Sequence, residues 1–237
     1  MRPPRTTEHP SLMPTNSADD ADAVDGDVRD RLIEGTDASD GDSTDDSISD
    51  APAGVTHPAR KGGRVTDIPA VAARLTLTDE TLEIREADGD DPASFDLRFA
   101  DIIYLRDGQQ EINGTAVESL SIRHVRPPAA AATTEVSLWD DAAHDRLAGI
   151  VGDYYRTQRE AVAELEPTEP QLELLVRLYS LGGEMDPSEM LSKSAAELAA
   201  LFDPLREVDL LRKGETGVFL TGRGYLLVNE TMDDETM

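Results

Sequence analysis

The stretch from Gly62 to Trp139 contains short runs of apolar and β-branched residues, separated by turn residues. Such runs predict strands, and the turns between them are too short to hold a helix. Strands that follow one another this closely predict an antiparallel sheet, because parallel neighbours need a long crossover. The predicted strands are Ala72 to Leu77, Thr81 to Arg85, Ser94 to Phe99, Ile102 to Arg106, Val117 to Val125 and Thr134 to Trp139.

A single long amphipathic pattern follows these strands. Apolar residues recur on one stripe from Asp140 to Leu165, which predicts a helix with Asp140 or Asp141 as its N-cap. Pro167 ends the pattern. An antiparallel sheet followed by one long helix is the order of a pleckstrin-homology-like module, which we expect over residues 56–166.

The remaining residues, 167–237, have the pattern of a winged helix-turn-helix domain: three helices, a hairpin and a closing helix. Ser194 with Glu197 forms a predicted capping box, and Pro204 is expected to kink or end the third helix. The predicted elements are helices at Gln171 to Leu181, Pro187 to Leu191, Ser194 to Pro204 and Thr221 to Val228, a separate turn at Leu205 to Leu211, and a hairpin at Leu210 to Arg212 and Val218 to Leu220.

The first 50 residues carry fourteen acidic residues against four arginines and no aromatic residue. A segment of this composition cannot bury enough apolar surface to offset its conformational entropy. We therefore expect a disordered acidic tail over residues 1–55. The overall expectation is an α+β chain with two folded domains after that tail.

The formal net charge of the chain is −27, from 22 basic and 49 acidic residues. Such a charge repels polyanions, so nucleic acid and anionic membranes are poor default partners. In molar salt the screening length falls to about 3 Å, and exposed carboxylates then largely stop repelling one another. Together with only three lysines among the basic residues, this composition favours a halophile's cytoplasmic protein.

The motifs of catalysis and cofactor binding are missing from the sequence. The chain has no cysteine, no phosphate-binding loop, no dinucleotide glycine fingerprint and no run apolar enough to cross a membrane. Asp140 and His144 stand one helical turn apart, but nothing completes a metal shell around them. We expect no enzyme, no cofactor and no bound metal.

Positive charge concentrates in the segment from His57 to Arg64. This patch could receive an acidic partner through arginine pairing, or it could be a linker whose cations pair with nearby carboxylates. On the strand that carries Arg123 and His124, one of the two must face outward. The candidate partner-binding residues are His57, Arg60, Lys61, Arg64, Arg123, His124, Arg212, Lys213 and Arg223.

A DNA-binding regulator is the alternative function, because winged helices commonly read DNA through the third helix. That helix is acidic here, and residues 169–237 carry six basic against fourteen acidic residues. Specific DNA binding draws much of its affinity from phosphate neutralisation, so DNA is an unfavourable partner.

Three segments of the chain resemble, in order and spacing, the CheF family of archaeal taxis proteins. They are Thr56 to Val65, Ser119 to Val125, and Leu174 to Gly183 followed by Leu220 to Gly224. The resemblance extends over residues 55–232. It implies a non-enzymatic adaptor between the chemotaxis response regulator CheY and the archaellum motor machinery.

The amino-terminal part departs from this family. Family members carry a further folded region before the segment that resembles His57 to Arg60, whereas residues 1–50 are predicted to be disordered. If the missing region holds a partner surface, the chain would bind only CheY or only the motor.

Overall fold

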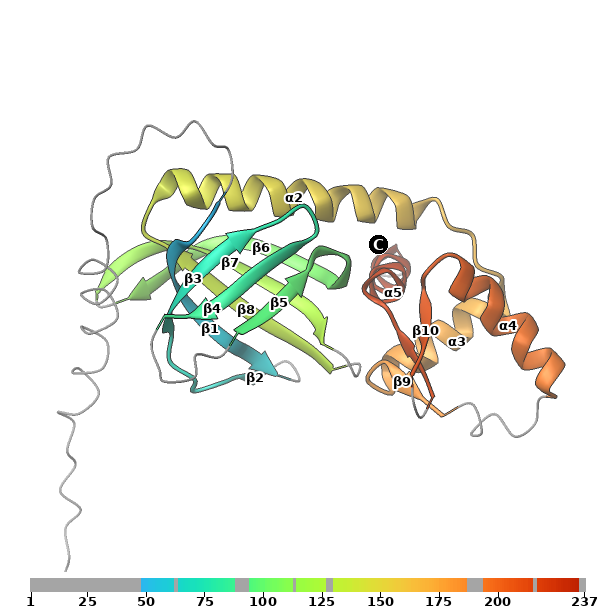
Figure 1. The fold of residues 1–237 in the computed structure, drawn as a ribbon. Helices are drawn as coiled ribbons and strands as arrows, with labels where there is room; N and C mark the ends of the chain where they lie inside the picture. The colour runs from blue at the N-terminus through green and yellow to red at the C-terminus, as the bar shows by residue number, and fades with distance from the viewer. Residues whose placement is uncertain are drawn as a thin grey trace, which may run out of the picture.

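The computed structural model describes residues 48–61, 64–87, 94–112, 114–126, 130–186, 194–214 and 217–234. They form a large antiparallel sheet, a long helix that lies along it, and a smaller helical part with a second sheet (Figure 1). The α+β class and the antiparallel sheet predicted from the sequence are confirmed.

The large sheet has eight strands, of which seven follow the order β5-β4-β3-β1-β8-β7-β6 and the eighth, β2, pairs with the end of β1. Each of the six predicted strands is present, although β6, β7 and β8 begin or end several residues beyond the predicted limits. The strands are β1 (Ala51–Lys61), β2 (Arg64–Val65), β3 (Val71–Leu77), β4 (Thr81–Glu86), β5 (Ser94–Arg98), β6 (Ile102–Ile112), β7 (Thr115–Arg126) and β8 (Ala130–Leu138).

Strand β1 is the main departure from the predicted strands. The disordered tail was expected to reach residue 55, but Ile48 is buried and β1 begins at Ala51, paired with both β3 and β8. Residues 1–47 lie outside the described residues. Proline and glycine residues hide this strand in the sequence, because both are unfavourable in a central strand.

A bulge lets β1 accommodate Pro58. Between Thr56 and Arg60, β1 advances four residues while β8 advances only from Glu135 to Thr133. Pro58 lies within this irregularity, where its missing N–H removes no regular ladder bond. The carbonyl oxygens of Pro58 and Ala59 accept hydrogen bonds from the Thr66 hydroxyl instead, at 2.5 and 3.2 Å.

The long predicted helix is confirmed as α2 (Asp141–Ala163). The side chain of Asp140 accepts a hydrogen bond from the Ala142 N–H, as an N-cap should. Leu147 and Val151 are fully buried and belong to the same core cluster as the sheet interior. No helix among the described ranges is long and apolar enough to span a membrane.

The C-terminal part contains three helices and a three-stranded sheet of order β10-β11-β9. The predicted hairpin and closing helix are present, the Ser194 capping box forms, and β9 was not predicted. The predicted helix from Pro187 to Leu191 lies outside the described residues. The elements are α3 (Glu169–Ser180), β9 (Glu184–Met185), α4 (Ala195–Glu207), β10 (Leu211–Lys213), β11 (Val218–Leu220) and α5 (Gly222–Asp234).

Of the two predicted effects of Pro204, a kink or a helix end, the helix end is wrong, because α4 continues through Pro204 to Glu207. A proline inside a helix costs about 3 kcal/mol, since one hydrogen bond is lost. Phe202 and Leu205 lie on either side of it and are both buried in the C-terminal core. Burial of these two side chains holds the last turn helical.

The apolar core of the C-terminal part extends onto the large sheet and α2. Ile103 of β6, Val125 of β7 and Val162 of α2 belong to the C-terminal cluster rather than to the cluster inside the sheet. Arg159 of α2 also binds Glu230 of α5 through two hydrogen bonds, of 2.7 and 2.8 Å. The C-terminal helices are thus packed onto the sheet and α2 through both apolar and charged contacts.

A close backbone approach marks this junction. Gly222, at the start of α5, lies against the short 3-10 helix η1 (Phe99–Asp101). A methyl group at Gly222 would overlap the carbonyl oxygen of Ala100 and come within 2.9 Å of the Asp101 Cα. Only glycine fits here without moving the two parts apart.

We expect Gly222→Ala to lower the free energy of unfolding by about 1 to 3 kcal/mol, the usual cost of overpacking a tight contact. Denaturant titration in molar KCl measures this. The matched control is Gly149→Ala on the exposed face of α2, where an added Cβ meets no atom within 4 Å. That change should raise stability by roughly 0.5 to 1 kcal/mol, and an equal response of the two variants would contradict the packing argument.

Candidate functional site

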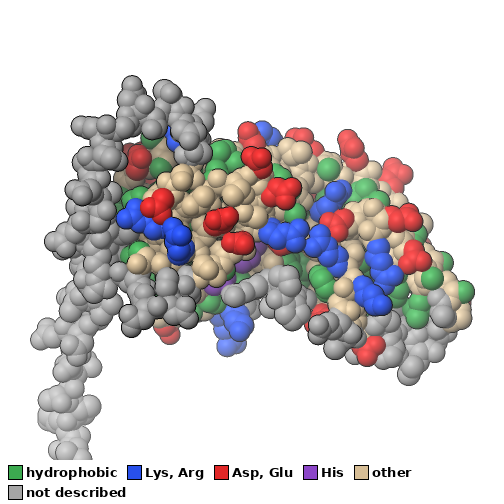
Figure 2. Space-filling view, in the orientation of Figure 1, with side chains coloured by type: hydrophobic (Ala, Val, Ile, Leu, Met, Phe, Trp, Pro, Cys, Tyr) green, Lys and Arg blue, Asp and Glu red, His purple; other side chains and the backbone are tan. Residues whose placement is uncertain are grey.

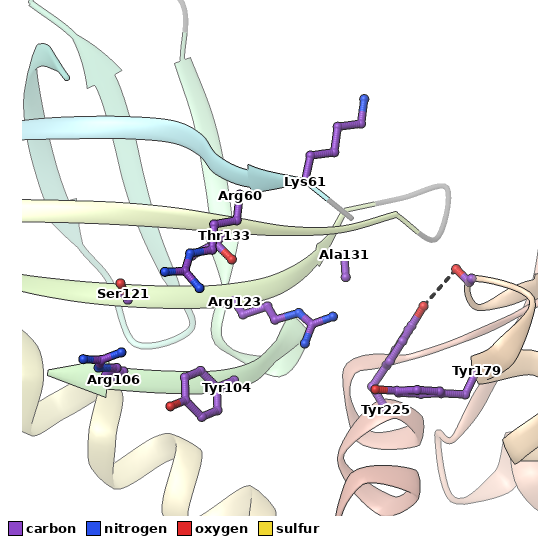
Figure 3. Close-up of a pocket in the computed structure, with 11 residues that line it drawn as sticks. Arg60, Lys61, Tyr104, Arg106, Ser121, Arg123, Ala131, Thr133, Tyr179 and Tyr225 are labelled. Carbon is purple, nitrogen blue, oxygen red and sulfur yellow. Dashed lines mark hydrogen bonds between the residues drawn. The ribbon is translucent and has the colours of Figure 1, made fainter. Parts of the chain in front are cut away.

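A cleft of about 700 Å³ lies between the end of the large sheet and the C-terminal helices. The sheet contributes basic side chains and one tyrosine, and the helices contribute two more tyrosines (Figure 3). The lining residues that matter for its chemistry are Arg60, Lys61, Tyr104, Arg106, Arg123, Tyr179 and Tyr225.

Strand pairing brings three of these residues into one row. Arg60 of β1 stands opposite Thr133 of β8, Thr133 opposite Arg123 of β7, and Arg123 opposite Tyr104 of β6. Directly opposite residues of antiparallel strands point to the same face. Arg106 follows two residues after Tyr104 and therefore faces the same way.

Among the described residues no carboxylate lines this cleft, although the chain has 49 acidic residues and Glu135 lies with Arg60 and Arg106 in an adjoining pocket. Arg60, Lys61, Arg106 and Arg123 make no ion pair with any described residue. Other arginines of the chain do find carboxylates, for example Arg156 with Asp153 at 2.8 Å and Arg206 with Asp203 at 3.0 Å. In the space-filling view of Figure 2, basic side chains lie among the acidic ones on the drawn face. The cleft is thus a local positive region in an acidic protein.

The helical wall of the cleft depends on two glycines that end α3. Gly182 and Gly183 have φ values of +90° and +96°, a conformation that favours glycine. The Tyr225 hydroxyl donates to the Gly182 carbonyl at 2.9 Å, and its ring packs against Tyr179 with centroids 5.4 Å apart. Burial raises the pKa of Tyr225 above its ordinary value of 10.0; nearby Tyr179 adds to the rise and Arg123 opposes it.

The predicted basic patch only partly coincides with the cleft. Arg60, Lys61 and Arg123 line it. Arg64 lies at the exposed start of β2, opposite Lys61 in the register of the two strands. Arg212, Lys213 and Arg223 do not line it. Arg212 pairs with Asp209 at 3.2 Å, Lys213 is exposed at the end of β10, and Arg223 is partly buried.

The two histidines predicted to bind a partner point inward. His124 is 4% exposed, whereas Arg123 is exposed, so the arginine is the outward residue of the pair. The Thr134 hydroxyl, fully buried, lies 2.8 Å from Nδ1 of His57 and 2.9 Å from Nε2 of His124. These two rings are stacked 5.6 Å apart, and they help to hold β1, β7 and β8 together.

His144 does not share a site with Asp140. It is 3% exposed, and its Nε2 lies 3.0 Å from Asp107 of β6, with Glu118 close by. A metal ion on Nε2 would put a proton on Nδ1, a buried atom without a hydrogen-bond partner. The arrangement therefore suits a tether between β6 and the start of α2 better than a metal centre.

Tyr104, Arg106, Tyr179 and Tyr225 were not among the predicted site residues. The alternation of Tyr104 with Arg106 on one strand is a signal that they share a face. Nothing in the sequence shows that the two helical tyrosines lie opposite them, because that depends on how the C-terminal part packs.

We expect Thr134→Val to lower the free energy of unfolding by about 1 to 3 kcal/mol, because the half-buried His57 and the buried His124 both lose this hydroxyl while the side-chain volume is kept. Chemical denaturation measures it. Thr76→Val, on β3 of the same sheet, is the control and should change stability by no more than roughly 0.5 kcal/mol. Equal effects at the two positions would show that the hydroxyl at Thr134 stabilises nothing.

Tyr225 should contribute to a pH-dependent loss of stability in alkali. Its pKa is raised in the folded state, so its stabilising contribution is complete below the ordinary pKa of 10.0 and is lost as the pH rises through the raised value. The stability difference between wild type and Tyr225→Phe should therefore be smaller at pH 11 than at pH 8. Between pH 6 and 8 the difference should stay constant, and a constant difference up to pH 11 would contradict the assignment.

Comparisons with known proteins give the cleft a family context. Residues 46–160 match the family model of archaeal chemotaxis signal transduction system protein F, CheF. Taxis protein CheF2 of Halobacterium salinarum is 30% identical over 182 residues, which cover 75% of this chain and 60% of that protein. The chain thus spans about 60% of the length of this relative.

The similar solved structures share much less sequence with this chain. A structure of the Vav1 exchange factor with its PH and C1 domains covers 56% of this chain and 33% of its own, at 11% identity and a TM-score of 0.29. A structure of PLC21 of L. pealei covers 80% of this chain and 27% of its own, at 9% identity and a TM-score of 0.34. The family model and the taxis relative, by contrast, match on sequence, and the chain is similar to the CheF family of archaeal chemotaxis signal transduction proteins.

Proposed function

We propose that this chain is a non-enzymatic adaptor of archaeal taxis, which connects a CheY-type response regulator to the cytoplasmic motor proteins of the archaellum. Similarity to the CheF family supports the taxis role. The single structural observation that carries the adaptor role is the exposed basic rim at the end of β1 and the start of β2, in a chain of net charge −27. We define this basic rim as Arg60, Lys61 and Arg64.

The basic rim suits an acidic partner. All three side chains are exposed, and Figure 3 shows the Lys61 side chain directed away from the sheet. At molar salt only charges in direct contact still attract, because the screening length is about 3 Å. An arginine still attracts a carboxylate under these conditions, because a bidentate guanidinium–carboxylate pair is held by direct hydrogen bonds. Partners that work in the same salt-rich cytoplasm would carry the same acidic excess.

The C-terminal part fits protein contact better than DNA contact. Its helices and three-stranded sheet follow the order of a winged helix, in which α4 would be the recognition helix. Arg206 is the sole cation of α4, and it is paired with Asp203. Arg212 of the wing is paired with Asp209. Arginines that are already bound to carboxylates offer little to phosphate groups. We therefore expect the C-terminal part to contact a protein rather than DNA.

The binding test uses the full chain immobilised in molar KCl, with a CheY-type regulator and the archaellum cytoplasmic proteins offered separately. We expect both classes of partner to bind. Lys61→Gln with Arg64→Gln should weaken binding of at least one partner about tenfold, equivalent to about 1.4 kcal/mol. Loss of the two exposed cations removes direct contacts to acidic groups.

The matched control is Arg85→Gln with Arg156→Gln. It removes the same charge from two exposed arginines whose carboxylate partners are Asp50 and Asp153. Binding should change less than twofold. Failure of the wild-type chain to bind either partner would refute the adaptor function, and equal weakening by both double variants would refute the basic rim as the docking surface.

A further inference from the structure

Aromatic side chains are concentrated in the cleft more than elsewhere in the chain. The protein has five tyrosines, and three of them line this one cavity. Tyr225 has a structural role, because its hydroxyl binds the Gly182 carbonyl. Tyr104 has no such role and is 50% exposed, in a protein with 4% aromatic residues. A half-exposed ring beside a cavity offers a flat apolar surface to a ligand.

Three arginines surround the same cavity, and none of them forms an ion pair with a described residue. Arg60, Arg106 and Arg123 come from three strands but project from one face of the sheet. Glu135 lies with Arg60 and Arg106 in an adjoining pocket and offsets part of their charge, and an anionic ligand would offset the rest. Guanidinium groups bind phosphate oxygens in pairs, which makes a phosphate chain a matching ligand.

The size and the walls of the cleft indicate what kind of anion could bind there. The cleft measures about 700 Å³ and is walled on two sides, which is the usual size of a small-molecule site. Figure 3 shows Arg60 and Arg106 on the sheet wall, with the Arg123 guanidinium directed toward the tyrosines of the helical wall. The smaller adjoining cleft, of about 370 Å³, shares Tyr104, Arg123 and Tyr179 with it, so the aromatic end is open for a ring system.

We propose that this cleft binds a purine nucleoside triphosphate. The phosphate chain lies among Arg60, Arg106 and Arg123, and the base packs against Tyr104 and Tyr179 at the aromatic end. Stacking of a base on an aromatic ring adds to the affinity that the phosphate contacts supply. The inference does not rest on the adaptor function, because it uses no protein partner.

Calorimetric titration of the full chain in molar KCl tests it, with ATP, GTP, sodium triphosphate and adenosine as probes. We expect ATP or GTP to bind at least tenfold more tightly than either triphosphate or adenosine alone, since the cleft then holds both ends of the ligand. Equal binding of triphosphate and nucleotide would reduce the site to an anion site and overturn the proposal. Absence of binding by both nucleotides would also overturn it.

Variants separate the two ends of the ligand. Arg106→Gln with Arg123→Gln should weaken ATP and triphosphate by the same factor of about ten or more. Tyr104→Ser should remove much of the advantage of ATP over triphosphate, whereas Tyr104→Phe, which keeps the ring, should retain it. An unchanged ATP-to-triphosphate ratio in Tyr104→Ser would refute stacking at this position.

Two controls keep a folding defect from being mistaken for a lost site. Arg85→Gln with Arg156→Gln should leave ATP binding unchanged, because neither residue lines the cleft. The midpoint of denaturant unfolding of Tyr104→Ser should match that of wild type, since the side chain is half exposed. Because no partner protein is present, failure of nucleotide binding would leave the adaptor function to its own test.

Discussion

The antiparallel register of β1 on β8 is the constraint on which the cleft depends. Side chains of a strand alternate between its faces, so a slip of one residue would turn Arg60 inward and Ala59 outward. The bulge between Thr56 and Arg60 inserts two extra residues, and an even number preserves the alternation on both sides of it. The histidine pair around Thr134 joins the same strands at this point. The face of the sheet that carries the arginines is therefore fixed by pairing within the sheet itself.

Much of the fold could be predicted because its signals are local. Alternating apolar residues gave the six strands, the stripe after Asp140 gave α2, and Ser194 with Glu197 gave the start of α4. The failures have non-local causes. Strand β1 contains Pro58, which a bulge accommodates, and Pro204 stays helical because buried neighbours hold it. At both prolines, tertiary contacts outweigh the local preference of proline to interrupt strands and helices.

The candidate site was predicted less completely than the fold. Arg60, Lys61 and Arg123 were identified because cations stand out in an acidic sequence. The sequence could not predict that His124 faces inward, because either Arg123 or His124 could be the outward residue of the strand. Tyr179 and Tyr225 belong to helices that follow the whole sheet in the sequence, and only the packing of the C-terminal part on the sheet brings them opposite its strands.

Helix α2 contacts both walls of the cleft, which limits how the cleft can change shape. Its first half packs into the sheet core through Leu147 and Val151, and its last turns reach α5 through Val162 and Arg159. A continuous helix resists bending, so the walls are joined by a strut rather than by a flexible connection. Any widening of the cleft must slide α5 along α2 and break the ion pair between Arg159 and Glu230. We therefore expect the cleft to be preformed, with its width fixed by the contacts between α2 and α5.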